Sequence, residues 1–146
     1  RKLSIPGVEI KVDSHAIKFI CNRANRRFIS IIKTNVAHLN NIIRGLHEKF
    51  IYELTICSVH FPITTKVEGD KVLISNFLGE KVSRKAKVLP GVEVEVKGQK
   101  IIVSGHDIEK AGQTALNIEK ASKVSGRDRR VFQDGIYITS KPGGKV

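Results

Sequence analysis

The side chains that most often carry out chemistry are few in this chain, and their spacing does not favour catalysis. The two cysteines, Cys21 and Cys57, lack the CxxC spacing of a redox or zinc site, so we expect two reduced thiols. The five histidines show neither HxxxH nor HExxH spacing. They are His15, His38, His47, His60 and His106. The sequence therefore predicts no metal site.

One small group of residues resembles an acid–base cluster. His106 and Asp107 are adjacent and Glu109 follows them, which leaves a small enzyme as an alternative function. Residues of these types at the start of a helix more often cap it, and Asp is a favoured N-cap. Because no nucleophile motif, phosphate-binding loop or metal-ligand spacing accompanies the group, we expect neither catalysis nor a cofactor.

Basic residues dominate the charged part of the sequence. Among 146 residues, 26 Lys and Arg against 14 Asp and Glu give a formal net charge of +12. A folded domain with this charge repels itself unless a polyanion neutralises it. Nucleic acid is the commonest such partner, since lysines and arginines that bind its phosphates release counterions. A soluble protein that is basic without such a partner is the alternative.

The cations gather in three segments, each with candidate phosphate contacts. These candidates are Lys81, Arg84, Lys85, Lys123, Arg127, Arg129, Arg130, Lys141 and Lys145. The middle segment holds four cations within eight residues, just after a predicted helix. One or two cations there would offset the helix dipole, at about 0.3–1 kcal/mol each. Four exceed that need, which favours contacts between guanidinium groups and phosphates.

The remaining composition narrows the kind of partner. No apolar run reaches the roughly 18 residues of a membrane-spanning helix, and no signal-peptide pattern opens the chain, so we expect no membrane partner. Aromatic residues make up only 5% of the chain, and we expect Phe61, Phe77 and Phe132 to be core residues. Few exposed aromatic platforms then remain, which favours recognition of the backbone and shape of double-helical RNA.

An internal repeat organises the chain. The heptad Pro-Gly-Val-Glu-Ile-Lys-Val at residues 6–12 returns as Pro-Gly-Val-Glu-Val-Glu-Val at residues 90–96, an offset of 84 residues. Apolar residues alternate with charged ones in both heptads, which predicts strands with one buried face. Each heptad precedes a second strand, then a helical pattern and an apolar stretch that contains Tyr52 or Tyr137. Both copies therefore predict a hairpin, a helix and a strand.

The two helical patterns differ in their buried faces. In the first, apolar residues recur with a 3.6-residue period from about Asn22 and stop at Gly45. In the second, the helix should begin after the N-cap Asp107 and end before Gly126, with small residues on one face. That face should allow close packing against a sheet.

The second copy has an additional hairpin that the first copy lacks. It should run roughly from Lys66 to Val88, with its first turn at residues 68–70. The first copy should have an equivalent ahead of Arg1, and the chain contains no Met. We therefore expect these residues to belong to a longer protein whose first hairpin precedes Arg1.

Three motifs carry a resemblance to a known family. The core of the first is Arg-x-Phe-x-Asp-Gly-Ile-Tyr at residues 130–137, within a matching stretch from 124 to 138 that Lys141 follows. The other two are His-Phe-Pro-Ile at 60–63 and Asn-Phe-Leu-Gly-Glu-Lys at 76–81. From about Asn22 onward, the chain resembles universal large-subunit ribosomal protein six, called nine in eukaryotic cytosolic ribosomes. Without the Pro-x-x-Tyr-Lys-Gly-Lys-Gly tail of bacteria, it is most similar to the archaeal and eukaryotic branch.

The resemblance implies an α+β fold of two tandem similar domains, each an antiparallel-rich sheet packed against one helix. Residues 1–60 would form the first, incomplete domain, residues 61–140 the main RNA-binding domain, and residues 141–146 a basic tail. The nine basic candidates would then contact large-subunit ribosomal RNA near the sarcin–ricin loop and the landing site of translational GTPases. Asp134 and Gly135 would shape a turn, and Phe132 and Tyr137 would lie in the core.

The resemblance also implies the partners and the location. The partners would be large-subunit ribosomal RNA and neighbouring ribosomal proteins, with translational GTPases nearby, in the cytosolic ribosome. No catalytic, metal or cofactor site is implied. A free-standing RNA or DNA chaperone outside the ribosome is the alternative.

Overall fold

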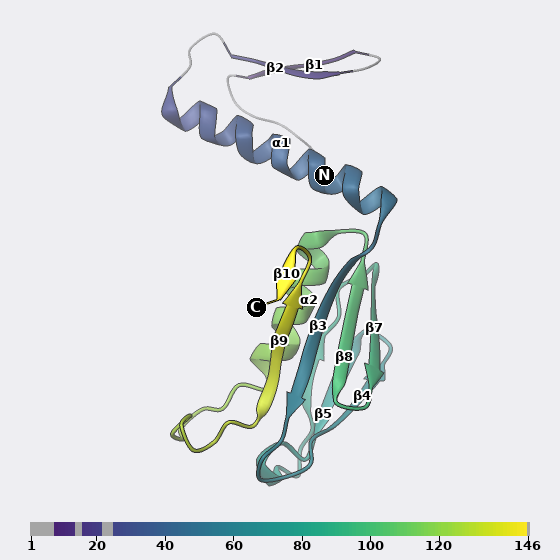
Figure 1. Ribbon diagram of the computed structural model, residues 1–146, viewed down its shortest axis with the longest axis vertical. Coiled ribbons are helices and arrows are strands. Elements are labelled where there is room, and N and C mark those ends of the chain that lie inside the picture. Colours follow the sequence, from purple (N-terminus) through teal and green to yellow (C-terminus); the bar gives the residue numbers. More distant parts are fainter. Residues whose placement is uncertain (1–7, 14–15, 22–24, 146) are drawn as a thin grey trace. The chain divides into compact units, whose positions relative to one another are not determined.

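The computed structural model describes residues 8–13, 16–21 and 25–145 (Figure 1). The chain divides into two compact units, residues 1–44 and residues 45–146. Both contain helix and antiparallel sheet, which confirms the predicted α+β class.

The first unit consists of a hairpin and most of a long helix. The strands β1 (Glu9–Val12) and β2 (Ile17–Ile20) pair with each other. Helix α1 (Arg26–His47) begins after Asn25, whose side-chain oxygen accepts a hydrogen bond of 2.9 Å from the Phe28 N–H. The apolar stripe was predicted to stop at Gly45, and the helical backbone continues beyond it to His47.

Gly45 is buried in this helix, and its lack of a side chain allows close packing there. A Cβ atom there would overlap the carbonyl oxygen of His106. The carbonyl oxygen of Gly45 in turn lies 2.7 Å from Nδ1 of His106. A glycine that would end an isolated helix is needed here for close packing within the second unit.

The second unit contains two antiparallel sheets and one helix. The five-stranded sheet has the order β10-β9-β3-β8-β7, and the three-stranded sheet the order β4-β5-β6. The elements are β3 (Phe50–Cys57), β4 (Thr64–Glu68), β5 (Lys71–Ser75), the 3-10 helix η1 (Phe77–Gly79), β6 (Arg84–Lys87), β7 (Val92–Lys97), β8 (Lys100–Gly105), α2 (Ile108–Ala121), β9 (Gly135–Lys141) and β10 (Gly144–Lys145). The hairpin predicted between Lys66 and Val88 is confirmed as β4 and β5, and β6 extends it.

The two repeated hairpins have the same register. In β1 and β2, Val12 lies opposite Ile17, and in β7 and β8, Val96 lies opposite Ile101. Each pair is related to the other by the offset of 84 residues found in the sequence. The hairpin, helix and strand predicted for each copy are therefore present in that order.

Strand β3, which closes the first copy, lies in the middle of the second unit's sheet. It pairs antiparallel with β8 on one side and with β9 on the other, with an irregularity between Glu53 and Leu54. The boundary between the structural units thus falls before β3, whereas the sequence places a repeat boundary at residue 60.

Helix α2 lies against both sheets of the second unit and joins their cores. Its N-cap is Asp107, whose side chain accepts from the Glu109 N–H at 3.0 Å, as predicted. Ala111, Ala115 and Ile118 of α2 are fully buried against residues of both sheets. In Figure 1 the helix passes behind β9 and β3. Among the described residues of this unit, no helix covers the opposite face of the five-stranded sheet.

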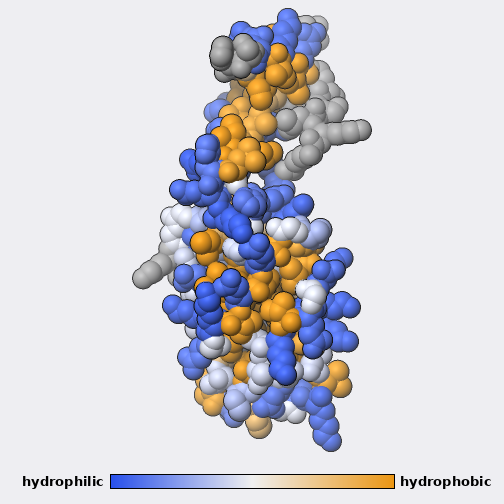
Figure 2. All heavy atoms as spheres, turned by 90° about the vertical axis from the view of Figure 1, so that its right-hand side faces the viewer, coloured by the Kyte–Doolittle hydropathy of each residue, from blue (hydrophilic) through white to orange (hydrophobic). Residues whose placement is uncertain are grey.

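The surface that carries the β4 and β7 edges mixes apolar and hydrophilic patches, as Figure 2 shows. Val67 of β4 is 41% exposed. No helix in the described part of the chain is long and apolar enough to cross a membrane.

Candidate nucleic-acid interface

Arg84 is the most strongly bound of the predicted phosphate contacts. Its guanidinium donates to both carboxylate oxygens of Glu80, at 2.8 and 2.6 Å, and to the carbonyl oxygens of Ala121 and Lys123, both at 3.0 Å. It also lies over the ring of Phe77, 4.1 Å from the centroid. Most of the hydrogen-bonding capacity of the guanidinium is therefore used within the fold.

This arrangement ties β6 to the end of α2. The hydrogen bond from Arg84 is the main cause that lowers the pKa of Glu80, and the charge of Arg127 contributes. Because Arg127 belongs to the loop after α2 and Glu80 precedes β6, the cations around β6 lie beside those that follow α2. The structure thus brings Arg84, Lys123 and Arg127 together.

The loop between α2 and β9, residues 122–134, presents the predicted arginines; we call it the arginine loop. Asp128 organises its turn: its carboxylate accepts from the backbone N–H of Arg130 at 2.9 Å and from the Arg130 guanidinium at 3.0 and 3.2 Å. These hydrogen bonds lower the pKa of Asp128. The side chain of Arg130 remains 90% exposed, and Arg127 and Arg129 are also exposed. The loop therefore holds its cations outward.

Phe132, near the end of the arginine loop, contacts both Arg127 and His60. The guanidinium of Arg127 lies over its ring, 4.7 Å from the centroid, and the ring of His60 stacks on it at 4.7 Å between centroids. Phe132 is half-buried and packs against the core, in agreement with the sequence prediction. His60 comes from the segment between β3 and β4, so the stack joins the arginine loop to that segment.

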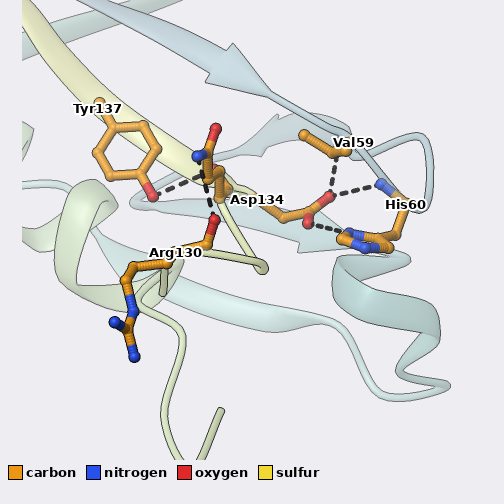
Figure 3. Close-up of polar contacts among 6 residues, drawn as sticks. Val59, His60, Arg130, Asp134 and Tyr137 are labelled. Carbon is orange, nitrogen blue, oxygen red and sulfur yellow. Dashed lines mark hydrogen bonds and ion pairs between the residues drawn. The ribbon is translucent and has the colours of Figure 1, made fainter. Parts of the chain in front are cut away.

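Asp134 binds the segment that contains His60 through three polar contacts, which Figure 3 shows. Its carboxylate, 1% exposed, accepts from the N–H groups of Val59 at 2.7 Å and His60 at 3.0 Å. It also lies 2.7 Å from Nδ1 of His60. Burial raises the pKa of Asp134, but the hydrogen bonds from His60 and Val59 outweigh it and lower the pKa to about 2. An ionised carboxylate only accepts, so Nδ1 of His60 must donate.

Tyr137 is a candidate residue of the nucleic-acid interface that the sequence analysis did not predict. The prediction that it lies in the core is wrong, because 42% of it is exposed. Strand alternation contained the signal: Ile136 is fully buried and Ile138 packs against the core, so the residue between them must face outward. The predicted role of Asp134 in shaping a turn is extended by its contacts with Val59 and His60.

The remaining cations are spread more widely. Lys81 and Lys85 are exposed around β6, and Lys141 is exposed at the end of β9. Since β9 has seven residues, Lys141 lies roughly 20 Å from the start of this strand. The side chain of Lys145 lies outside the described residues. Lys141 is therefore not part of the cluster around the arginine loop.

No catalytic arrangement accompanies the cations in the part of the chain that the structure describes. Asp107 caps α2, and His106 contacts the backbone of Gly45, as expected of structural residues. Among the same residues, no three His, Cys, Asp or Glu side chains gather as metal ligands would. Cys21 and Cys57 do not form a disulfide with each other in the described residues. Fold and surface together define a class: a basic α+β protein whose cations are held outward on a loop beside a buried carboxylate.

Comparisons with known proteins identify the family. The family model described as ribosomal protein L6 matches residues 61–135. The large ribosomal subunit protein uL6 of Methanococcus vannielii is 46% identical over 143 residues, which cover 98% of this chain and 79% of the relative. Its counterpart in Sulfurisphaera tokodaii is 49% identical over 137 residues, covering 94% and 74%. That of Archaeoglobus fulgidus is 44% identical over 142 residues, covering 97% and 72%.

This chain belongs to the ribosomal protein L6 family, and these three relatives are archaeal. The resemblance inferred from the three motifs is therefore confirmed. A member of this family has a structural role in the ribosome and is not an enzyme.

Proposed function

We propose that this protein is a constituent of the large ribosomal subunit that binds large-subunit ribosomal RNA near the sarcin–ricin loop and the landing site of translational GTPases. The observation that carries the proposal is the arginine loop. Its guanidinium groups are exposed, Asp128 binds that of Arg130, and the buried carboxylate of Asp134 fixes the end of the loop against Val59 and His60. Guanidinium groups bind phosphates bidentately, and a loop fixed before binding loses little entropy on contact.

The proposed RNA contacts fall into two groups. The first group would be the cations of the arginine loop, Lys123, Arg127, Arg129 and Arg130, together with Lys81 and Lys85 around β6. A second contact would come from Lys141 and Lys145 beyond the end of β9. Arg84 would act mainly by holding Lys123 and the end of α2 in place, with its remaining hydrogen-bonding capacity toward the RNA.

The proposed partners are large-subunit ribosomal RNA and neighbouring ribosomal proteins, with translational GTPases nearby, in the cytosolic ribosome. Residues 1–60 and 61–140 would be two tandem related domains, with residues 141–146 as a basic tail. The shared register of the repeated hairpins supports such a duplication. In this arrangement β3 would link the domains by adding a strand to the second one.

The salt dependence of RNA binding tests the proposed site. We would measure the affinity of the full chain for a transcript that contains the sarcin–ricin region, at several salt concentrations. Replacing Arg127, Arg129 and Arg130 with Ala should weaken binding and reduce the log–log salt slope by about 0.9 for each phosphate that is no longer neutralised. An unchanged slope would assign these arginines to folding or to a protein partner.

A matched control removes the same charge elsewhere. Lys97, Lys100 and Lys110 are exposed on the second unit and lie outside the arginine loop. Their replacement with Ala should leave the salt slope closer to that of the parent chain. An equal loss of affinity for both triple variants would mean that only net charge matters.

Association with ribosomes separates the proposal from a free-standing RNA chaperone. The protein should sediment with large subunits, whole ribosomes and polysomes in sucrose gradients at low and high salt. A loosely bound chaperone should wash off at high salt and stay at the top of the gradient.

A further inference from the structure

Tyr137 presents an aromatic surface whose position is fixed by the protein. Its hydroxyl donates to the carbonyl oxygen of Gln133 at 3.2 Å (Figure 3). Its ring lies against Gly135, where a Cβ atom would come within 2.9 Å of the ring carbon Cζ. One part of the ring is thus held against the backbone, and 42% of the residue stays exposed.

The surroundings of Tyr137 leave room for a ligand. On the outward face of the sheet its neighbours are small: Gly135 and Thr139 on its own strand, and Thr55 opposite on β3. Among the described residues, β10 pairs only with Ser140 and Lys141 of β9 and does not extend along the edge of β9 beside Tyr137. An aromatic ring without large neighbours can be stacked upon.

Tyr137 and Arg129 together line two adjacent hollows of different chemistry. The first, of about 310 Å³, also contains Lys120 and Lys123, with one carboxylate, that of Glu119. The second, of about 560 Å³, is lined by Ile56, Val59, Gln99 and Gln133 among others, and its charged residue is Arg129. The first hollow suits a phosphate. The second suits a flat group with hydrogen-bonding edges.

We propose that Tyr137 and Arg129 form a site for one unpaired nucleotide of the bound RNA, whose base stacks on Tyr137. The base occupies the second hollow, where the amides of Gln99 and Gln133 reach its edge. The adjoining phosphate occupies the first hollow, beside Lys123 and Arg129. This inference rests on the proposed function, because it names the part of the RNA that the arginine loop receives.

The charges around the two hollows favour RNA over a protein partner. Tyr and Arg are also common in protein interfaces. However, three cations against one carboxylate in the first hollow would repel a basic ribosomal protein and attract a phosphate. A base paired within a duplex could not lie flat on Tyr137, so the nucleotide must be unpaired.

The test compares Tyr137→Leu, Tyr137→Phe and the parent chain, all at full length, with the transcript that contains the sarcin–ricin region. Stacking on an aromatic residue contributes about 1–3 kcal/mol per base, so Tyr137→Leu should weaken binding about 5- to 150-fold. Its salt slope should not change, because stacking releases no counterions. Tyr137→Phe keeps the ring and should bind within about threefold of the parent chain. Ultraviolet cross-linking should attach RNA to the peptide that contains Tyr137.

Phe61→Leu is the matched control, because Phe61 lies outside both hollows and, contrary to the prediction that it is a core residue, is 46% exposed. The inference is overturned if Tyr137→Leu binds like the parent chain, if Phe61→Leu weakens binding equally, or if the slope falls together with the affinity. A loss of ribosome association without a loss of RNA affinity would assign the ring to a protein partner, which also overturns it. If the parent chain binds no RNA, the proposed function fails as well. If it binds RNA and Tyr137→Leu does not differ, only this inference fails.

Discussion

The buried carboxylate of Asp134 should contribute measurable and pH-dependent stability to the second unit. Its pKa is lowered from 3.8 to about 2 by hydrogen bonds from His60 and Val59 that outweigh the opposing effect of burial. Each pKa unit corresponds to about 1.4 kcal/mol, so the ionised form contributes on the order of 2 kcal/mol. Because the folded pKa is the lower one, this contribution is present above pH 3.8 and is lost as pH falls through about 2.

The substitution Asp134→Asn isolates the charge, since it keeps the shape of the side chain and one oxygen acceptor. At pH 7 the variant should lose about 2 kcal/mol of unfolding free energy relative to the parent chain. The difference should shrink as pH falls from about 4 and be small near pH 2, where about half of the parent carboxyl is neutral.

Urea unfolding followed by tyrosine fluorescence is the suitable assay. The chain has two tyrosines and no Trp, and Tyr52 and Tyr137 both lie in the second unit. Asp128→Asn is the control: this carboxylate is exposed and belongs to the same loop, so its replacement should matter much less. A difference for Asp134→Asn that is the same at pH 7 and pH 2 would refute the reasoning, because charge would then not be its cause.

Three other substitutions test single contacts. Arg84→Lys should destabilise the second unit by about 2–3 kcal/mol in urea unfolding, because Lys cannot replace the four hydrogen bonds of the guanidinium. Gly45→Ala should cost about 1–3 kcal/mol in the same assay, since the new Cβ would overlap the carbonyl of His106; unchanged stability would show that this helix end can move. Gly135→Ala should displace the ring of Tyr137 and lower RNA affinity more than stability, so retained affinity would argue against a fixed ring.

Sequence patterns predicted the local elements of this fold well, because their signals are local. Alternation indicated the two repeated hairpins, and Asp107 marked the start of α2. The position of β3 was not predictable in this way, since its partners β8 and β9 lie far along the chain. Only the offset repeat hinted at related strands, and it placed β3 with the first copy.

The candidate site likewise has features that local sequence patterns predict and features that depend on distant residues. Composition and clustering identified the cations of the arginine loop, which are exposed as expected. The partners of Arg84 and Asp134 come from segments distant in sequence, such as the end of α2 and the segment that contains His60, so no spacing rule connects them. Tyr137 was missed for a different reason. An apolar stretch was taken as a core strand, although strict alternation places its middle residue on the outside.

Three acidic residues of this basic chain hold side chains at or near the proposed RNA-binding surface in place. Glu80 binds Arg84, Asp128 binds Arg130, and Asp134 binds His60, whose ring stacks on Phe132. Without these carboxylates, the repelling cations would move apart and would have to be ordered again on binding. The three carboxylates reduce the net attraction for phosphate, yet Glu80 and Asp128 fix the guanidinium groups of Arg84 and Arg130, and Asp134 fixes the end of the loop. Specific placement on RNA depends on that geometry more than on total charge, since phosphate contacts set the register of a protein on its nucleic acid.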